Sequence, residues 1–291
     1  MQLLAVRHVT VYQYSQAVRL GEHRMLFRPR ESHDLRLLST QLVITPQPIS
    51  VRWLHDVFDN SLAIAVFDGL ASTLRFDSTV ALEHVETPLP DYALEPYARF
   101  YPFRYADDEL PDLDRGLALH YPSGDLVAWA RQFLGPDGSI ETLDLLRSIT
   151  LGIKDGFRYE RRDEKGIQSP SETLQRRSGS CRDFALLMME AVRCLGLAAR
   201  FVSGYIFVPN ADPAGLSGGG ATHAWTQVYL PGAGWVDFDP TNNIVGNRNL
   251  IRVAVAWDPK QVLPLWGTFV GAASSFLGMS VFVSVTEKET V

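Results

Sequence analysis

Residues 178–197 read SGSCRDFALLMMEAVRCLGL and predict one buried helix. Apolar side chains recur at helical spacing behind Cys181, and Gly196 is a typical C-terminal stop. The pattern puts Cys181 at the helix N-terminus, directly after the small residues Gly179 and Ser180. Because unpaired backbone N–H groups and the positive end of the helix dipole lie there, this position favours a thiolate. The apolar stripe consists of Phe184, Leu187, Met188, Ala191 and Leu195.

The chain has two cysteines, Cys181 and Cys194. They lie near opposite ends of the predicted helix, roughly 20 Å apart at about 1.5 Å per residue, which is too far for a disulfide. Two cysteines without neighbouring histidines also make no structural zinc site, because zinc there needs four converging ligands. A free cysteine often only fills space in a core. We keep that interpretation for Cys194, and position alone leaves it open for Cys181.

A histidine and two aspartates lie on a predicted hairpin downstream. Of the seven histidines, only His223 follows Cys181. It opens HAWTQVYL, residues 223–230, and after the turn-forming PGAG the chain continues as a second strand, WVDFDPT. Parity gives this hairpin an apolar core face and an aromatic, polar face that carries His223. The core face holds Ala224, Thr226, Val228, Leu230, Val236 and Phe238, and the other face holds Trp225, Gln227, Tyr229, Trp235, Asp237 and Asp239.

The two faces persist through the hairpin only if its connection has an odd number of residues or a bulge. With residue 225 opposite residue 239, His223 is diagonal to Asp239, roughly 7 Å away between backbones. A thiol, an imidazole and a carboxylate are the nucleophile, base and orienting group of a cysteine acyl-transfer site. Asp237 is the alternative third member. Its neighbour Asp239 is favoured by position, because Pro240 ends the strand there.

The rest of the chain divides in two. From residue 3 to about 85 the hydrophobic pattern has a period of two, with turn-rich interruptions, and predicts an N-terminal antiparallel β-sandwich over residues 1–90. A proline-rich stretch, residues 87–114, connects it to helical segments and then to strands that run with interruptions to Val285. We therefore expect an α+β protein whose second unit, residues 91–291, includes the C-terminal strands.

Composition excludes some partners. The 291 residues are 46% hydrophobic and carry a formal net charge of −6, without a basic block of the kind that binds nucleic acid. The longest apolar stretch, Leu263 to Val285, is interrupted by Pro264 and several glycines and serines, which argues against a membrane span. No signal peptide pattern opens the chain. These features predict a soluble, cytoplasmic protein with neither a membrane nor a nucleic-acid partner.

Three blocks in order, GSCRDFA, RFVSGY and HAWTQVYLPGAGWVDFDPTNN, closely resemble the core of bacterial transglutaminase-like proteins, a superfamily that includes cysteine proteases. The opening VRHVTVYQYSQAVRLGEHRMLFRPRE resembles the β-rich N-terminal region that accompanies this core. The resemblance implies a papain-like core, with a catalytic helix packed on an antiparallel sheet. It also implies that Cys181, His223 and Asp239 are the catalytic triad, which selects Asp239 over Asp237.

The chemistry implied by the resemblance is thioester formation from an amide, followed by transfer to water or to an amine. We expect hydrolysis of a peptide or protein substrate, because nothing in the sequence marks an amine site. The alternatives are a protein-glutamine transglutaminase and a non-catalytic peptide-binding scaffold. No calcium loop is recognisable, so we expect neither a metal nor another cofactor. The segment VAVAWDPKQVLPLWGTF, residues 253–269, departs from the family pattern, a difference that can alter the cleft rim. The sequence does not identify a second oxyanion donor, and Gln168 is no more than a guess for it.

Overall fold

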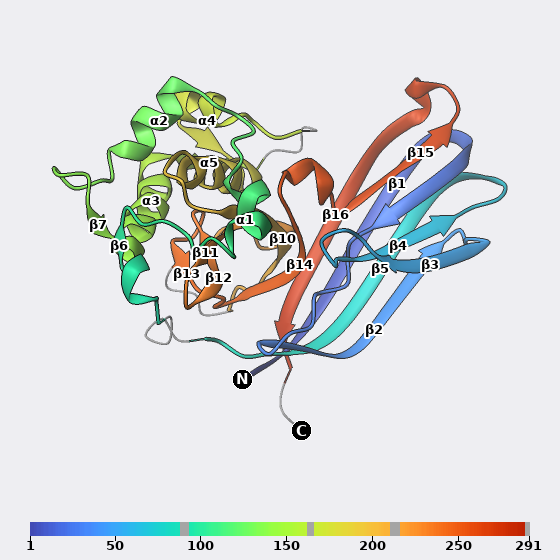
Figure 1. Cartoon of the computed structure of the whole chain (residues 1–291). Coiled ribbons are helices and arrows are strands. Elements are labelled where there is room, and N and C mark those ends of the chain that lie inside the picture. The colour runs from blue at the N-terminus through green and yellow to red at the C-terminus, as the bar shows by residue number, and fades with distance from the viewer. Residues whose placement is uncertain (88–92, 162–165, 210–215, 289–291) are drawn as a thin grey trace.

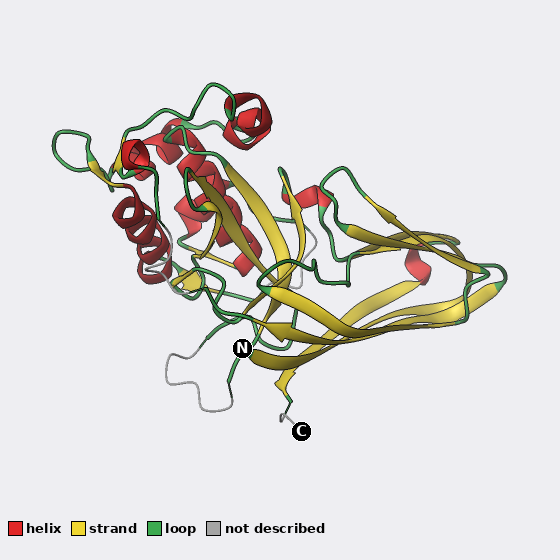
Figure 2. Cartoon of the chain, turned by 60° about the horizontal axis from the view of Figure 1, so that its bottom comes forward, coloured by secondary structure: helices red, strands yellow, loops and turns green. Residues whose placement is uncertain are grey.

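The computed structural model describes residues 1–87, 93–161, 166–209 and 216–288. A long, curved N-terminal sheet stands beside a core in which helices cover a second sheet (Figure 1). Figure 2 shows the α-helices gathered on the core, away from the far end of the N-terminal sheet. The helices of the core are α1 (Leu110–Leu117), α2 (Gly124–Arg131), α3 (Thr142–Gly156), α4 (Pro170–Arg176) and α5 (Cys181–Cys194).

The described N-terminal strands form one seven-stranded sheet and not the two packed sheets of the expected sandwich. The strand order is β2-β5-β1-β4-β3, and β15 and β16 also pair with β1. Alternation identifies one buried face per strand, which a curved single sheet and a sandwich both provide, so the pattern could not distinguish them. The strands are β1 (Gln2–Met25), β2 (Leu35–Thr45), β3 (Ser50–His55), β4 (Ser61–Val66), β5 (Leu70–His84), β15 (Leu265–Val270) and β16 (Phe276–Glu287).

Strand β1 makes this single sheet possible because it is 24 residues long and changes partners along its length. Its first part lies between β5 and β16, and its last part lies between β4 and β15. Register shifts in these pairings bend the strand. The C-terminal strands, which we expected in the core, thus return to the N-terminal sheet. Hydrophobic period gives the face of a strand but not its partner.

The core sheet is antiparallel throughout, with the order β13-β12-β11-β10-β14. Leu230 pairs with Gly234, so three residues connect the β11–β12 hairpin, and the expected odd-numbered connection is confirmed. Apolar residues of the predicted core face pack with α5 in one cluster. The strands are β10 (Ala199–Ile206), β11 (His223–Leu230), β12 (Gly234–Asp239), β13 (Ile244–Val245) and β14 (Leu250–Ala256). Two short pairs complete the core: β6 (Phe100–Tyr101) with β7 (Ile140–Glu141), and β8 (Arg158–Tyr159) with β9 (Ser178–Gly179).

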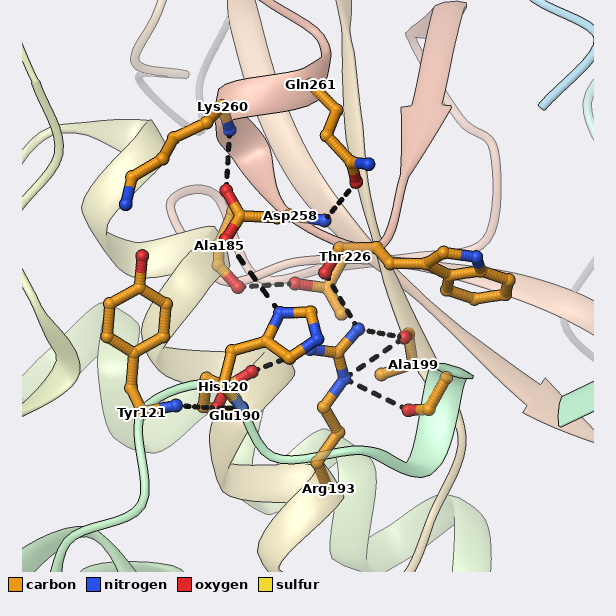
Figure 3. A network of polar contacts seen from close by, with 12 residues as sticks. His120, Tyr121, Ala185, Glu190, Arg193, Ala199, Thr226, Asp258, Lys260 and Gln261 are labelled. Atoms are coloured by element: carbon orange, nitrogen blue, oxygen red, sulfur yellow. Dashed lines mark hydrogen bonds and ion pairs between the residues drawn. The ribbon is translucent and has the colours of Figure 1, made fainter. Parts of the chain in front are cut away.

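A buried ion pair at the C-terminal end of α5 fixes the helix to its surroundings (Figure 3). Arg193 donates to Glu190 at 2.7 Å, and neither side chain is exposed. Glu190 also accepts from the backbone N–H groups of His120 and Tyr121, both at 2.9 Å. Arg193 also donates to the carbonyl of Ala199 on β10, at 2.9 Å. The network ties the C-terminal end of α5 to the sheet and to the α1–α2 connection.

Candidate active site

Cys181 is the first residue of α5, as its sequence position predicts. Asp183 accepts from the backbone N–H of Ser180 at 2.7 Å and from its hydroxyl at 2.8 Å. The other oxygen of Asp183 accepts from the backbone N–H of Gln168 at 2.7 Å. These contacts give Asp183 a structural role at the helix start. Cys181 is buried but keeps 7% of its surface exposed.

His223 and Asp239 are joined directly. The imidazole Nε2 lies 2.8 Å from Asp239 Oδ2, and both side chains are fully buried. Asp239 accepts two further hydrogen bonds, from the backbone N–H of Thr241 at 2.9 Å and from Asn242 Nδ2 at 2.7 Å. Burial opposes the charge of this carboxylate, but His223, Asn242 and Thr241 together hold the pKa of Asp239 below its ordinary value. The carboxylate therefore stays ionised beside the imidazole.

The same imidazole interacts with Cys181. Burial alone would lower the pKa of His223, but the Asp239 carboxylate and then the Cys181 sulfur raise it above its ordinary value. Because Nε2 is occupied by Asp239, Nδ1 is the ring nitrogen left for the sulfur. Nδ1 makes no hydrogen bond of ordinary geometry within the described residues. The three residues predicted from the sequence are thus brought together, with the imidazole between the sulfur and the carboxylate.

The alternative carboxylate, Asp237, has other partners. Trp225 donates to it through Nε1 at 2.6 Å, and Arg252 lies 3.4 Å from its other oxygen. Burial raises the pKa of Asp237 above its ordinary value despite the opposing charge of Arg252. Arg252 in turn pairs with Asp34 of the N-terminal part at 2.9 Å. Asp237 therefore belongs to a network that joins the two parts of the chain, and it does not contact His223.

The two tryptophans predicted on the same face as His223 have different surroundings. The ring of Trp225 stacks on the His223 ring, with centroids 6.0 Å apart and an interplanar angle of 28°. Trp225 is fully buried, so it supports the imidazole and offers no surface to a substrate. Trp235 lies under the Arg200 guanidinium, 4.1 Å from its ring centroid, and contacts Trp257. Only Trp225 is part of the site.

Asn242 is a site residue that the sequence reasoning missed. Besides donating to Asp239, its Nδ2 donates to the carbonyl of Ser217 at 3.1 Å, and its Oδ1 accepts from the Ser217 N–H at 2.7 Å. The Ser217 N–H fixes the orientation of the amide, because it requires an oxygen opposite it. An asparagine three positions after the strand-ending Asp239, in DPTNN, was the available signal.

The segment held by Asn242 covers the imidazole. Gly218 has a φ of +101°, and a Cβ there would lie 2.5 Å from His223 Nδ1, so the close approach requires glycine. This segment belongs to the glycine-rich loop over residues 210–222, of which residues 210–215 lie outside the described part. In the described part, Ser217 and Gly218 lie directly against the proposed catalytic base.

A small cavity of about 50 Å³ opens beside His223. The segment from Pro259 to Pro264, where the sequence departs from the family pattern, supplies one wall of this cavity. Gln168 uses its backbone N–H on Asp183, and its Oε1 accepts from Thr173 at 3.4 Å. Neither of these contacts shows Gln168 acting as an oxyanion donor. The cavity is lined by Ile167, Arg182, Phe201, Ser203, Thr222, His223, Ala224, Pro259, Val262, Leu263 and Pro264.

Across the described residues, no group of three or more histidine, cysteine, aspartate or glutamate side chains is arranged to hold a metal ion. No helix in that part of the chain combines the length and apolar character needed to cross a membrane.

Known proteins resemble the chain in both of its parts. Residues 128–240 match the transglutaminase-like superfamily, and residues 4–83 match the bacterial transglutaminase-like N-terminal region. A protein of Mycobacterium tuberculosis without an assigned function is 28% identical over 292 residues, which is 96% of this chain and 91% of that protein. A protein-glutamine gamma-glutamyltransferase of Pseudomonas aeruginosa is 36% identical over 75 residues, 25% of this chain and 11% of that enzyme.

A solved structure from Cytophaga hutchinsonii, described as a candidate cysteine protease, has the same fold. It aligns with a TM-score of 0.70 and 20% identity, over 100% of this chain and 92% of that one. The matches cover the core and the N-terminal region in the order in which they occur here. The chain therefore belongs to the transglutaminase-like superfamily, with the bacterial transglutaminase-like N-terminal region preceding its core.

Proposed function

We propose that this protein cleaves amide bonds of peptides or proteins through a thioester on Cys181. The observation that carries the proposal is the convergence of three groups from distant parts of the core: the Cys181 thiol, the His223 imidazole and the Asp239 carboxylate. The orientation also supports it. The imidazole presents one nitrogen to the carboxylate and the other to the sulfur, as a general base between its nucleophile and its orienting group requires.

In the proposed reaction the thiol proton passes to His223 Nδ1, and the sulfur adds to the carbonyl carbon of the amide. Because the pKa of His223 is raised, the imidazolium form is favoured next to the thiolate. When the tetrahedral intermediate collapses, the C–N bond breaks and His223 gives its proton to the leaving amine. Water, activated by the same imidazole, then adds to the thioester and releases the acid and the thiol. Asp239 remains ionised throughout and holds the ring in place.

Transfer of the acyl group to an amine is the second candidate. It is supported by the similarity of 75 residues to the Pseudomonas aeruginosa protein-glutamine gamma-glutamyltransferase. The two candidates share every step up to the thioester and differ only in the acceptor. We favour water, because no feature of the described residues around His223 reserves a place for an amine.

Trapping the thioester tests the proposal. The parent protein and Cys181→Ala are incubated with a peptide pool, quenched in acid and digested, and the peptide that contains residue 181 is analysed by mass spectrometry. We expect an acyl adduct on Cys181 in the parent and none in the variant. Repeating the incubation with a fluorescent primary amine separates hydrolysis, which leaves the amine unlabelled, from transfer. The absence of any adduct from a broad pool would contradict the proposal.

A further inference from the structure

Tyr159 is held next to the start of α5 by its backbone. It lies on β8, which pairs in parallel with β9, and in that register Tyr159 is opposite Gly179. The following residue, Glu160, donates its backbone N–H to the carbonyl of Gly179 at 2.8 Å. Gly179 precedes Cys181 by only two positions. The pairing therefore fixes the backbone of Tyr159 at the point where the chain enters the helix that carries the nucleophile.

The side chain of Tyr159 also turns toward this helix end. Its ring meets the ring of Phe184 edge-on, with centroids 6.5 Å apart and an interplanar angle of 63°. Phe184 lies three positions after Cys181, so both residues occupy the same face of α5. The ring of Tyr159 is thus packed against the first turn of α5, close to Cys181 in the helix.

No hydrogen bond joins the hydroxyl of Tyr159 to another residue within the described part of the chain. Burial, and next the negative charge of Cys181, raise the pKa of Tyr159 to about 12. The hydroxyl therefore stays protonated at any pH where the thiolate reacts. The effect of the Cys181 charge on Tyr159 also means that the phenol oxygen lies within electrostatic range of the sulfur. Tyr159 is a hydrogen-bond donor beside the nucleophile, with no acceptor in the resting protein.

We propose that Tyr159 is a further catalytic residue whose hydroxyl donates a hydrogen bond to the oxyanion of the tetrahedral intermediate. As the sulfur adds to the carbonyl carbon, the C=O π pair moves onto oxygen, and the Tyr159 O–H stabilises that charge without transferring its proton. The backbone N–H of Cys181 is the second donor, because the first residue of a helix has no intrahelical acceptor. Collapse re-forms the C=O bond and expels the amine. The inference rests on the proposed function and completes its site.

The test is Tyr159→Phe, which removes one oxygen and keeps the ring on Phe184. We expect kcat to fall by about 10²- to 10³-fold, the typical loss for one oxyanion donor, with little change in KM. The rate at which iodoacetamide alkylates Cys181 should stay at the parental value, since alkylation at a saturated carbon forms no oxyanion. Tyr12→Phe, in the N-terminal sheet, is the matched control and should leave both rates unchanged.

A second measurement uses a peptide aldehyde built on the acyl group recovered from the thioester. Its hemithioacetal places an oxyanion at the proposed position, so Tyr159→Phe should weaken aldehyde inhibition in parallel with kcat. Parental turnover in Tyr159→Phe would overturn the inference. So would a loss of alkylation equal to the loss of turnover, because Tyr159 would then act on the thiolate. A parent that neither turns over nor forms the thioester would contradict the proposed function itself, and this inference with it.

Discussion

The two ends of helix α5 differ in whether their buried polar groups have hydrogen-bond partners. At the C-terminal end, the Glu190–Arg193 pair is fully buried and every part of it meets a partner, including the carbonyl of Ala199. At the N-terminal end, the buried His223 Nδ1 makes no ordinary hydrogen bond among the described residues. A buried polar group without a partner costs free energy. Such a group is kept only at the N-terminal end of α5. This indicates that the N-terminal end serves chemistry and the C-terminal end serves stability.

The largest expected effect is on turnover, and it distinguishes Cys181 from Cys194, which lie at opposite ends of α5. We expect Cys181→Ala to abolish turnover and thioester formation, because no other group replaces the sulfur. Cys194→Ala, at the opposite end of the helix, should keep parental activity. Thermal unfolding of both variants checks that the fold is intact. A thioester on another residue of the Cys181→Ala variant would show that Cys181 is not the nucleophile.

Asp239→Asn should lower kcat by on the order of 10²- to 10⁴-fold, as loss of the orienting carboxylate does in related triads. The alkaline limb of the pH–rate profile should also move to lower pH, because burial lowers the pKa of His223 once the carboxylate no longer opposes it. The matched change Asp237→Asn acts on the Trp225–Arg252 network and should leave that limb in place. An unshifted alkaline limb in Asp239→Asn would contradict the proposed coupling.

The same pair makes stability depend on pH in a defined direction. The pKa of His223 is raised in the folded protein, so its contribution is complete below the unfolded value near 6.5 and is lost as pH rises through the folded value. The pKa of Asp239 is lowered, so its contribution is lost when pH falls through the folded value. Denaturant titrations across this pH range measure the free energies of unfolding of the parent and of Asp239→Asn. The two values should converge at the lowest and at the highest pH.

Glu190→Ala breaks the ion pair at the other end of the helix. It leaves the Arg193 charge buried without its carboxylate, and we expect a loss of about 3–5 kcal/mol in the free energy of unfolding. Arg147→Ala removes an exposed pair with Asp144, whose side chains are 45% and 53% exposed, and should cost less than about 1 kcal/mol. Equal, small losses in the two variants would show that the buried network does not fix α5.

The smallest effect belongs to Asn242. Asn242→Asp keeps an acceptor for the Ser217 N–H but loses the donor to Asp239, so we expect kcat/KM to fall by about 10- to 100-fold, the range for a hydrogen bond to a charged group. Asn243→Asp, at the next and exposed position, is the control. A parental pH–rate profile in Asn242→Asp would show that the amide does not position the carboxylate.

The sequence predicts the site better than the architecture around it. A helix start fixes Cys181, and the parity and odd connection of one hairpin fix His223 relative to Asp239, so local rules suffice. The pairing of β15 and β16 with β1 joins residues 240 or more positions apart, and hydrophobic period carries no information on such partners. Asn242 and Tyr159 escaped prediction because their roles come from backbone groups and a sulfur that only the tertiary fold brings to them.

The most direct test of the central claim is a competition between the two thiols of α5 for iodoacetamide near neutral pH. Cys194 is the more exposed of the two, and burial raises its pKa above the ordinary value, so it should react slowly although reagent can reach it. If Cys181, His223 and Asp239 act as one unit, Cys181 is alkylated first despite its burial, and Asp239→Asn slows this reaction. Faster labelling of Cys194 than of Cys181 would contradict the account.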